Sequence, residues 1–177
     1  GMNHAVKYME ASNCEVAYLC DVDHRRVASG MNRAKTSLAK FPQTKDPQGI
    51  NDFRRILDDK SIDAVSIATP NFWHTPMAIL AMEAGKHVYV EKPLAHNVWQ
   101  LRALKKAAKH YKIVSQMGNQ GHTTNGIRLI KEWYDQGILG EVREVHAWHG
   151  VFNFAPGNYF TKPETFPPSV CLLYTSD

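Results

Sequence analysis

The stretch Val88-Tyr89-Val90-Glu91-Lys92-Pro93-Leu94 carries the strongest structural signal in the chain. Its first three residues are apolar or aromatic and predict a buried strand. Pro93 lacks an amide hydrogen and fixes φ, so the strand is expected to end there. Glu91 and Lys92 then lie at the carboxyl end of the strand, where ligands bind in open α/β sheets. Taken alone, these residues leave two interpretations open: a site for proton transfer, or a surface ion pair ahead of a helix.

Strand and helix patterns alternate on both sides of this stretch. Strands are predicted over 15–20, 62–69, 87–90 and 113–117, and helices over 3–11, 24–40, 75–84, 97–111 and 124–136. A further short helix is expected after a cap at Asn51 or Asp52. Apolar strands that alternate with helices predict a parallel sheet covered on both faces. We therefore expect an α/β fold with a doubly wound parallel sheet over residues 1–120, from which the first strand is missing.

The pattern changes after residue 120. Val142 and Val145 alternate with polar residues and predict a strand over 141–148 with one wet face. We interpret 121–168 as the truncated beginning of a second, C-terminal α/β domain. Residues 169–177 follow a proline-rich segment and lack periodicity, so they are expected to be a non-native tail. A leader ahead of residue 1 would lie outside this chain, which leaves the compartment open between cytoplasm and periplasm.

The composition indicates an ordinary globular protein with a packed core. Hydrophobic residues make up 44% of the chain and charged residues 21%. The formal net charge is +4, but the basic residues are scattered over predicted helices rather than gathered in a patch for nucleic acid. No apolar run approaches the roughly 18 residues of a membrane span. The three cysteines lack metal-ligand spacing. We therefore expect no nucleic acid, membrane or metal partner.

Gly1 and Asp21 have the spacing of a dinucleotide-binding unit. In such a unit the last glycine of the phosphate loop opens a helix, and an acidic residue about 20 positions later binds the adenosine ribose. A carboxylate at Asp21 would repel a 2′-phosphate, which favours NAD over NADP, although Arg25 and Arg26 weaken that preference. Alternatively, residues 21–23 only cap the next helix, a role compatible with the first.

Polar residues also follow the strand predicted over 62–69. Thr69 and Asn71 have side chains that can hydrogen-bond a cofactor ribose or phosphate, and Pro70 separates them. His74 lies at the start of the next helix. A proline turn with a helix cap explains the same residues, so this segment alone supports either interpretation.

Lys92 is the residue expected to take part in chemistry. A lysine partly buried near a carboxylate and a nicotinamide can move a proton or orient a hydroxyl group that is being oxidised. After the strand predicted over 113–117, Gly118 allows close backbone approach. Gln120 offers an amide to a nicotinamide or a sugar in the same loop.

Four such segments, in this order, resemble the Gfo/Idh/MocA oxidoreductase family over residues 1 to about 155. The most specific matches are Ala68-Thr69-Pro70 with His74, then residues 85–93 and 116–120. The resemblance implies a Rossmann domain that binds NAD or NADP. It also implies a C-terminal α/β domain with the substrate contacts and the interface of a homo-oligomer. The substrates of the family are usually sugars, inositols or related polyols.

The resemblance also implies roles for individual residues. Lys92 matches the catalytic lysine of the family, and Asp21 matches the residue that binds the adenosine ribose. The loop along the cofactor is matched by Thr69, Pro70, Asn71 and His74. Glu91 matches a residue near the nicotinamide ribose, and Gln120 lies in the loop at the nicotinamide end. The family's second catalytic segment, which contains a histidine, lies beyond the end of this chain. The intact protein is therefore expected to be a dehydrogenase, and this fragment alone to be inactive. Two alternatives are an NAD-dependent glycosidase that oxidises its sugar transiently and a non-catalytic cofactor sensor.

Overall fold

The computed structural model describes residues 1–11, 13–119 and 124–146, which fall into two units. The first unit spans Gly1–Gly118, and the second begins at Asn119. The elements of the first unit are α1 (Met2–Glu10), β1 (Tyr18–Cys20), α2 (His24–Leu38), β2 (Gln48–Ile50), α3 (Arg54–Asp58), β3 (Ala64–Ile67), the 3₁₀ helix η1 (Asn71–Trp73), α4 (His74–Glu83), β4 (His87–Glu91), α5 (Val98–His110) and β5 (Ser115–Gly118). The second unit contains α6 (Asn125–Asp135).

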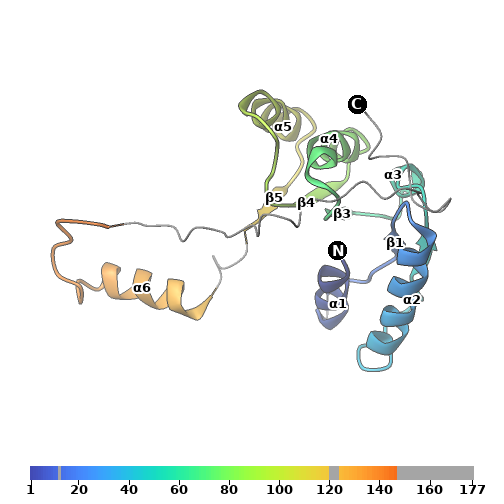
Figure 1. The fold of residues 1–177 in the computed structure, drawn as a ribbon, viewed down its shortest axis with the longest axis horizontal. Coiled ribbons are helices and arrows are strands. Elements are labelled where there is room, and N and C mark those ends of the chain that lie inside the picture. Colours follow the sequence, from blue (N-terminus) through green and yellow to red (C-terminus); the bar gives the residue numbers. More distant parts are fainter. Residues whose placement is uncertain (12, 120–123, 147–177) are drawn as a thin grey trace, which may run out of the picture. The chain divides into compact units, whose positions relative to one another are not determined.

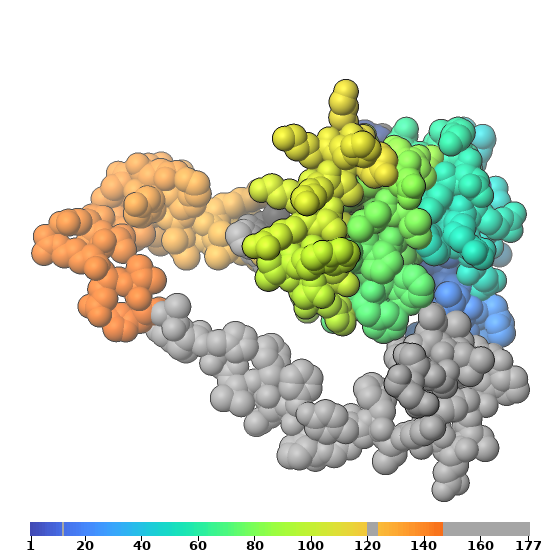
Figure 2. All heavy atoms as spheres, turned by 90° about the horizontal axis from the view of Figure 1, so that it is seen from above, coloured from blue at the N-terminus to red at the C-terminus, as the bar shows by residue number. Residues whose placement is uncertain are grey.

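All strand pairs of the first unit are parallel. β1 pairs with β2, and β3, β4 and β5 form a second ladder in that order. Helices α4 and α5 lie on one side of the strand layer, and α1 and α2 lie on the other (Figure 1). Figure 2 looks onto the first of these sides, where the atoms of α3, α4 and α5 form a continuous surface. This arrangement confirms the predicted α/β fold with a doubly wound parallel sheet.

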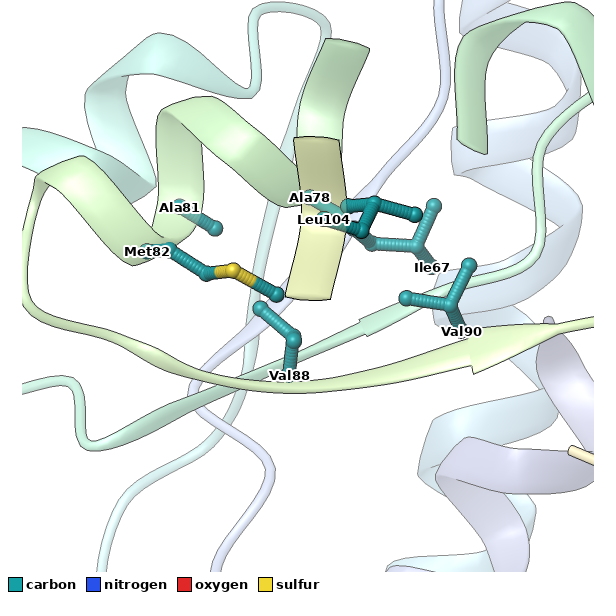
Figure 3. Packing of buried hydrophobic residues seen from close by; sticks show 7 residues of the cluster. All are labelled: Ile67, Ala78, Ala81, Met82, Val88, Val90 and Leu104. Atoms are coloured by element: carbon teal, nitrogen blue, oxygen red, sulfur yellow. The ribbon is translucent and has the colours of Figure 1, made fainter. Parts of the chain in front are cut away.

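The main core lies between the three-stranded sheet and its two covering helices. Ile67, Val88 and Val90 project from β3 and β4 toward Ala78, Ala81 and Met82 of α4 and Leu104 of α5 (Figure 3). Each of these side chains is at most 4% exposed. Because side chains alternate along a strand, burying positions 88 and 90 places positions 89 and 91 on the opposite face, where α1 lies. The apolar core therefore decides which way Glu91 points.

Helix boundaries follow the local signals in the sequence. Gly85 has φ of +78° two residues after the end of α4, and Gly137 has φ of +70° two residues after the end of α6. A left-handed residue at this position ends a helix, and glycine adopts it without steric cost. Asp52 accepts a hydrogen bond from the Arg54 backbone amide at 3.0 Å at the start of α3. The helix ends predicted at Gly85 and Gly137 are thus confirmed, while the N-cap of α3 is Phe53, one residue after the predicted Asp52.

Two strand predictions differ from the structure. The expected strand over 141–148 is wrong where the structure describes it, because residues 141–146 form no strand. A strand needs a hydrogen-bonded neighbour, and the described part of the chain offers none there. Conversely, β2 was not predicted, because Gly49 lies at its centre and glycine is depleted in strands. A Cβ at Gly49 would lie 2.6 Å from Val27 Cγ1, so glycine lets β2 pack closely under α2.

Candidate functional site

The carboxyl ends of β3, β4 and β5 lie at one edge of the sheet. Ile67 pairs with Val90, and Glu91 pairs with Gly118. Three segments therefore meet at this edge: the loop after β3, the residues Glu91 and Lys92, and the end of β5. This is the edge where open α/β sheets bind ligands.

Gly1 opens α1, as predicted. Its carbonyl oxygen accepts hydrogen bonds from the backbone amides of His4 at 2.9 Å and Ala5 at 3.2 Å. A Cβ at Gly1 would lie 3.9 Å from Ala68 Cβ, so the first turn of α1 lies beside the end of β3. A helix that begins with glycine at this edge has the geometry that favours phosphate groups. Cofactor contact by Gly1 itself stays a prediction.

His4, in the first turn of α1, contacts the predicted site although the sequence interpretation did not include it. Its Nε2 lies 2.8 Å from Glu91 Oε1, and its Nδ1 lies 3.0 Å from Ser66 Oγ on β3. Glu91 Oε2 also accepts a hydrogen bond from the Lys92 backbone amide at 3.2 Å. The signal in the sequence was a histidine three residues after the glycine that opens the helix.

His74 joins the loop after β3 to the turn after β4. The side chain is 1% exposed, with Nδ1 2.7 Å from the Pro93 carbonyl oxygen and Nε2 2.9 Å from the Thr69 carbonyl oxygen. A neutral imidazole donates through one nitrogen only, whereas an imidazolium donates to both carbonyls. His74 therefore connects the loop after β3 with the turn after β4 through hydrogen bonds. Its predicted contact with a cofactor stays a prediction.

The Thr69 hydroxyl is buried without a hydrogen-bond partner in the described part of the chain. A buried hydroxyl that lacks a partner costs free energy, which a ligand that pairs with it would recover. Pro70 and Asn71 are exposed beside it, at the start of η1. These residues provide polar groups at the predicted place, while their roles stay predictions.

Lys92 lies at the edge of the sheet as predicted, but its side chain is exposed. The sequence interpretation expected partial burial. The difference arises because Lys92 lies one residue beyond the end of β4, where the next residue, Pro93, is exposed as well. The Lys92–Pro93 peptide bond is cis. Gln120, the remaining predicted contact, lies outside the described residues.

Two roles were predicted for residues 21–23, a ribose contact and a helix cap, and Asp23 is the residue that forms the cap. Asp23 caps α2, because its Oδ1 accepts from the Arg25 backbone amide at 2.9 Å. The Arg25 side chain also donates to Asp23, and these hydrogen bonds lower the pKa of the Asp23 carboxyl group to about 2. Asp21 is exposed at the end of β1, with Oδ1 accepting from the Asp23 amide at 2.9 Å. The helix cap therefore does not use the Asp21 carboxylate.

Gly118→Ala is expected to displace the Tyr89 and Glu91 side chains of the candidate site. A Cβ at Gly118 would lie 2.8 Å from Tyr89 Oη and 3.0 Å from Glu91 Oε1, so both side chains must move. We expect about a tenfold loss of turnover in the full-length protein, since small displacements of reacting groups are costly. Steady-state kinetics would measure the loss. Gly126→Ala is the matched control, because nothing lies within 4 Å of its added Cβ. Unchanged turnover in Gly118→Ala would contradict the geometry.

The described residues contain neither a membrane-spanning helix nor a cluster of metal ligands. No helix there is long and apolar enough to cross a membrane. No group of three or more histidine, cysteine or acidic side chains gathers there to hold a metal ion.

The family model described as "Oxidoreductase family, NAD-binding Rossmann fold" (GFO_IDH_MocA) matches residues 1–119. The chain belongs to the Gfo/Idh/MocA oxidoreductase family. This confirms the resemblance found in the sequence motifs. It also places the strand-end residues described above inside the matched region.

Two curated relatives and one solved structure support this membership. Levoglucosan dehydrogenase of Pseudarthrobacter phenanthrenivorans is 39% identical over 92 residues, covering 52% of this chain and 24% of the relative. An alpha-N-acetylgalactosaminidase of Shewanella oneidensis is 32% identical over 148 residues, covering 80% and 31%. The structure of an NAD-binding protein from Listeria innocua matches with a TM-score of 0.67 and 29% identity, covering 80% and 38%. The chain thus spans a quarter to a third of these curated Gfo/Idh/MocA relatives.

Proposed function

We propose that this chain is part of an NAD(P)-dependent dehydrogenase that oxidises a sugar, an inositol or a related polyol. The observation that carries the proposal is the position of Glu91 and Lys92. They end β4 at the same sheet edge as the first turn of α1 and the Thr69 loop, in a chain of an NAD-binding family. The sugar-related activity of the levoglucosan dehydrogenase relative supports the substrate class.

The residues present fit a dinucleotide. The start of α1 at Gly1 would hold phosphate oxygens, and the unpaired Thr69 hydroxyl would pair with a polar group of the cofactor. The exposed Asp21 carboxylate would accept hydrogen bonds from ribose hydroxyls. When bound, the nicotinamide would supply the acceptor for the hydride.

The protein's own contribution to the reaction is proton handling and position. Lys92 Nζ would take the proton of the substrate hydroxyl as the carbon loses its hydride, so the alcohol becomes a ketone. Glu91 would fix the backbone of Lys92, whose amide it binds. We propose that a second catalytic group and most substrate contacts come from the C-terminal domain that begins at about residue 121.

A second candidate is a glycosidase that uses NAD without net redox. The match to the alpha-N-acetylgalactosaminidase is longer than the match to the dehydrogenase, at 148 against 92 residues. In such a reaction the sugar is oxidised, the aglycone is eliminated, water adds in its place, and the sugar is reduced again. Lys92 would then serve the oxidation and reduction steps in the same way.

The two candidates differ in what accumulates. The full-length protein would be incubated with NAD and a panel of polyols, sugars and aryl glycosides, while NADH absorbance and aglycone release are followed. NADH formed in proportion to a ketone product supports the dehydrogenase. Aglycone release without NADH supports the glycosidase. Binding of NADH with neither product would contradict both and would indicate a non-catalytic sensor.

The cofactor preference is expected to depend on Asp21. Asp21→Asn in the full-length protein removes the charge that repels a 2′-phosphate, while Arg25 stays paired with Asp23. We expect the preference for NAD over NADP to fall by about tenfold or more, because a like-charge contact costs several kcal/mol. The ratio of the two Kd values would measure it. Asp58→Asn, an exposed site on α3, is the matched control. An unchanged ratio in Asp21→Asn would contradict this role.

A further inference from the structure

We propose that His4 is a positioning residue that fixes the Glu91 carboxylate and, through it, the backbone of Lys92. The proposal rests on the dehydrogenase function proposed above, because it concerns how that site is held. It connects the helix that begins at Gly1 with the strand that ends at Glu91. His4 and Glu91 are 87 residues apart in sequence.

Both oxygens of the Glu91 carboxylate have a donor. Oε1 faces His4 Nε2 at 2.8 Å, and Oε2 accepts from the Lys92 backbone amide at 3.2 Å. The side chains of His4 and Glu91 are 19% and 14% exposed. A hydrogen bond shielded from water to this degree is stronger than one at the open surface. His4 thus supplies a long-range hydrogen bond that helps to fix the Glu91 carboxylate.

The direction of the hydrogen bonds follows from the donors available. A carboxylate only accepts, so His4 Nε2 must carry a proton. In a neutral ring Nδ1 then accepts from the Ser66 hydroxyl at 3.0 Å, and Tyr8 Oη donates to Ser66 at 3.4 Å. In an imidazolium ring Nδ1 donates to Ser66 instead. The bond to Glu91 is the same in both protonation states.

Ring contacts keep the imidazole in place. The Tyr89 ring meets the His4 ring edge-on, with centroids 5.4 Å apart and planes at 86°. Tyr89 and Glu91 both lie over Gly118, where a larger residue would clash with them. His4 is therefore held by Ser66, Tyr89 and Glu91, which come from two neighbouring strands.

One turn of α1 separates Gly1 from His4. The turn that would meet the phosphates also fixes the carboxylate beside Lys92, so cofactor placement and Lys92 placement share one rigid element. Removing the imidazole leaves the cofactor-facing end of α1 intact and takes away the hydrogen bond from His4 to Glu91 Oε1. The loss should therefore appear in kcat more than in the affinity for NADH.

The kinetic test uses the full-length protein with His4→Ala and His4→Gln. With the polyol that the wild type oxidises best, we expect kcat of His4→Ala to fall about 10- to 100-fold, since misplaced groups cost rate. The Kd for NADH should stay within about threefold, because the start of α1 is unchanged. His4→Gln should recover part of kcat, because its amide can donate to Glu91.

His110→Gln, exposed at the end of α5, is the control. Wild-type kcat in His4→Ala would overturn the proposal, as would equal losses of kcat and NADH affinity in both variants.

A second measurement does not depend on turnover. Nitrogen NMR of ¹⁵N-histidine-labelled full-length protein, with the His4 signals assigned from His4→Gln, reports which ring nitrogen carries the proton. We expect a proton on Nε2 and a shift of that signal in Glu91→Gln. A proton on Nδ1 alone, or no response to Glu91→Gln, would overturn the positioning role. If no polyol were oxidised by the wild type, the proposed function would fail while this measurement still decided the His4–Glu91 link.

Discussion

Replacing Lys92 by alanine in the full-length protein is expected to lower kcat for polyol oxidation by about 10²- to 10⁴-fold, the usual contribution of a general base or acid. The amine is the only group between Glu91 and Pro93 that can exchange a proton with a substrate hydroxyl. Its side chain makes no hydrogen bond within the described part of the chain, so its removal should leave the fold intact. Stopped-flow and steady-state measurements of NADH formation would give the loss.

Two companion variants separate proton transfer from charge. Lys92→Arg keeps the positive charge but cannot release a proton at ordinary pH, so it should be nearly as inactive as Lys92→Ala. Lys105→Ala, at an exposed position on α5, should behave as wild type. NADH binding should persist in all three. Near-normal turnover in Lys92→Arg would show that charge alone is needed, and loss of NADH binding in Lys92→Ala would move Lys92 from catalysis to cofactor binding.

The sheet and its functional edge were predictable because each depends on local signals. An apolar run that ends in Glu91-Lys92-Pro93 marks both a buried strand and its end. Glycines at positions 85 and 137 mark helix ends that need positive φ. Given alternating strands and helices, the carboxyl ends of β3, β4 and β5 must meet at one edge. The candidate residues at that edge follow from topology.

The contacts within the edge were not predictable, because they join residues far apart in sequence. His4 reaches Glu91 only because α1 packs on the face of the sheet opposite the apolar core. The sequence predicted His74 as a cofactor contact, which stays a prediction, but it did not indicate the contacts of the buried ring with the Thr69 and Pro93 carbonyl oxygens. The strand expected over 141–148 failed for a related reason: alternation predicts a strand only where a partner strand is present.

Lys86→Met is expected to lower the free energy of unfolding by about 2–4 kcal/mol, because two partly buried carbonyl groups lose their donor. Lys86 is 3% exposed, and its Nζ donates to the carbonyl oxygens of Asp59 at 2.6 Å and Ile62 at 2.8 Å. These carbonyls belong to the connection between α3 and β3, so the ammonium group ties that connection to the start of β4. Urea unfolding followed by circular dichroism would measure the change. Lys60→Met, at an exposed position in the same connection, is the control.

Lys86 and Lys92 are expected to contribute to different properties, Lys86 to stability and Lys92 to turnover. Both lysines lie within the segment 85–93 that carried the family resemblance, and the sequence pattern predicts a chemical role for Lys92 and none for Lys86. Burial separates them, because Lys86 is 3% exposed with its Nζ on two backbone carbonyl oxygens, whereas Lys92 is exposed at the edge of the candidate site. Lys86→Met should therefore lose stability while the folded fraction keeps its kcat, and Lys92→Ala should do the reverse. If Lys86→Met unfolded at the wild-type urea concentration, its two carbonyl contacts would not contribute to stability as the geometry requires.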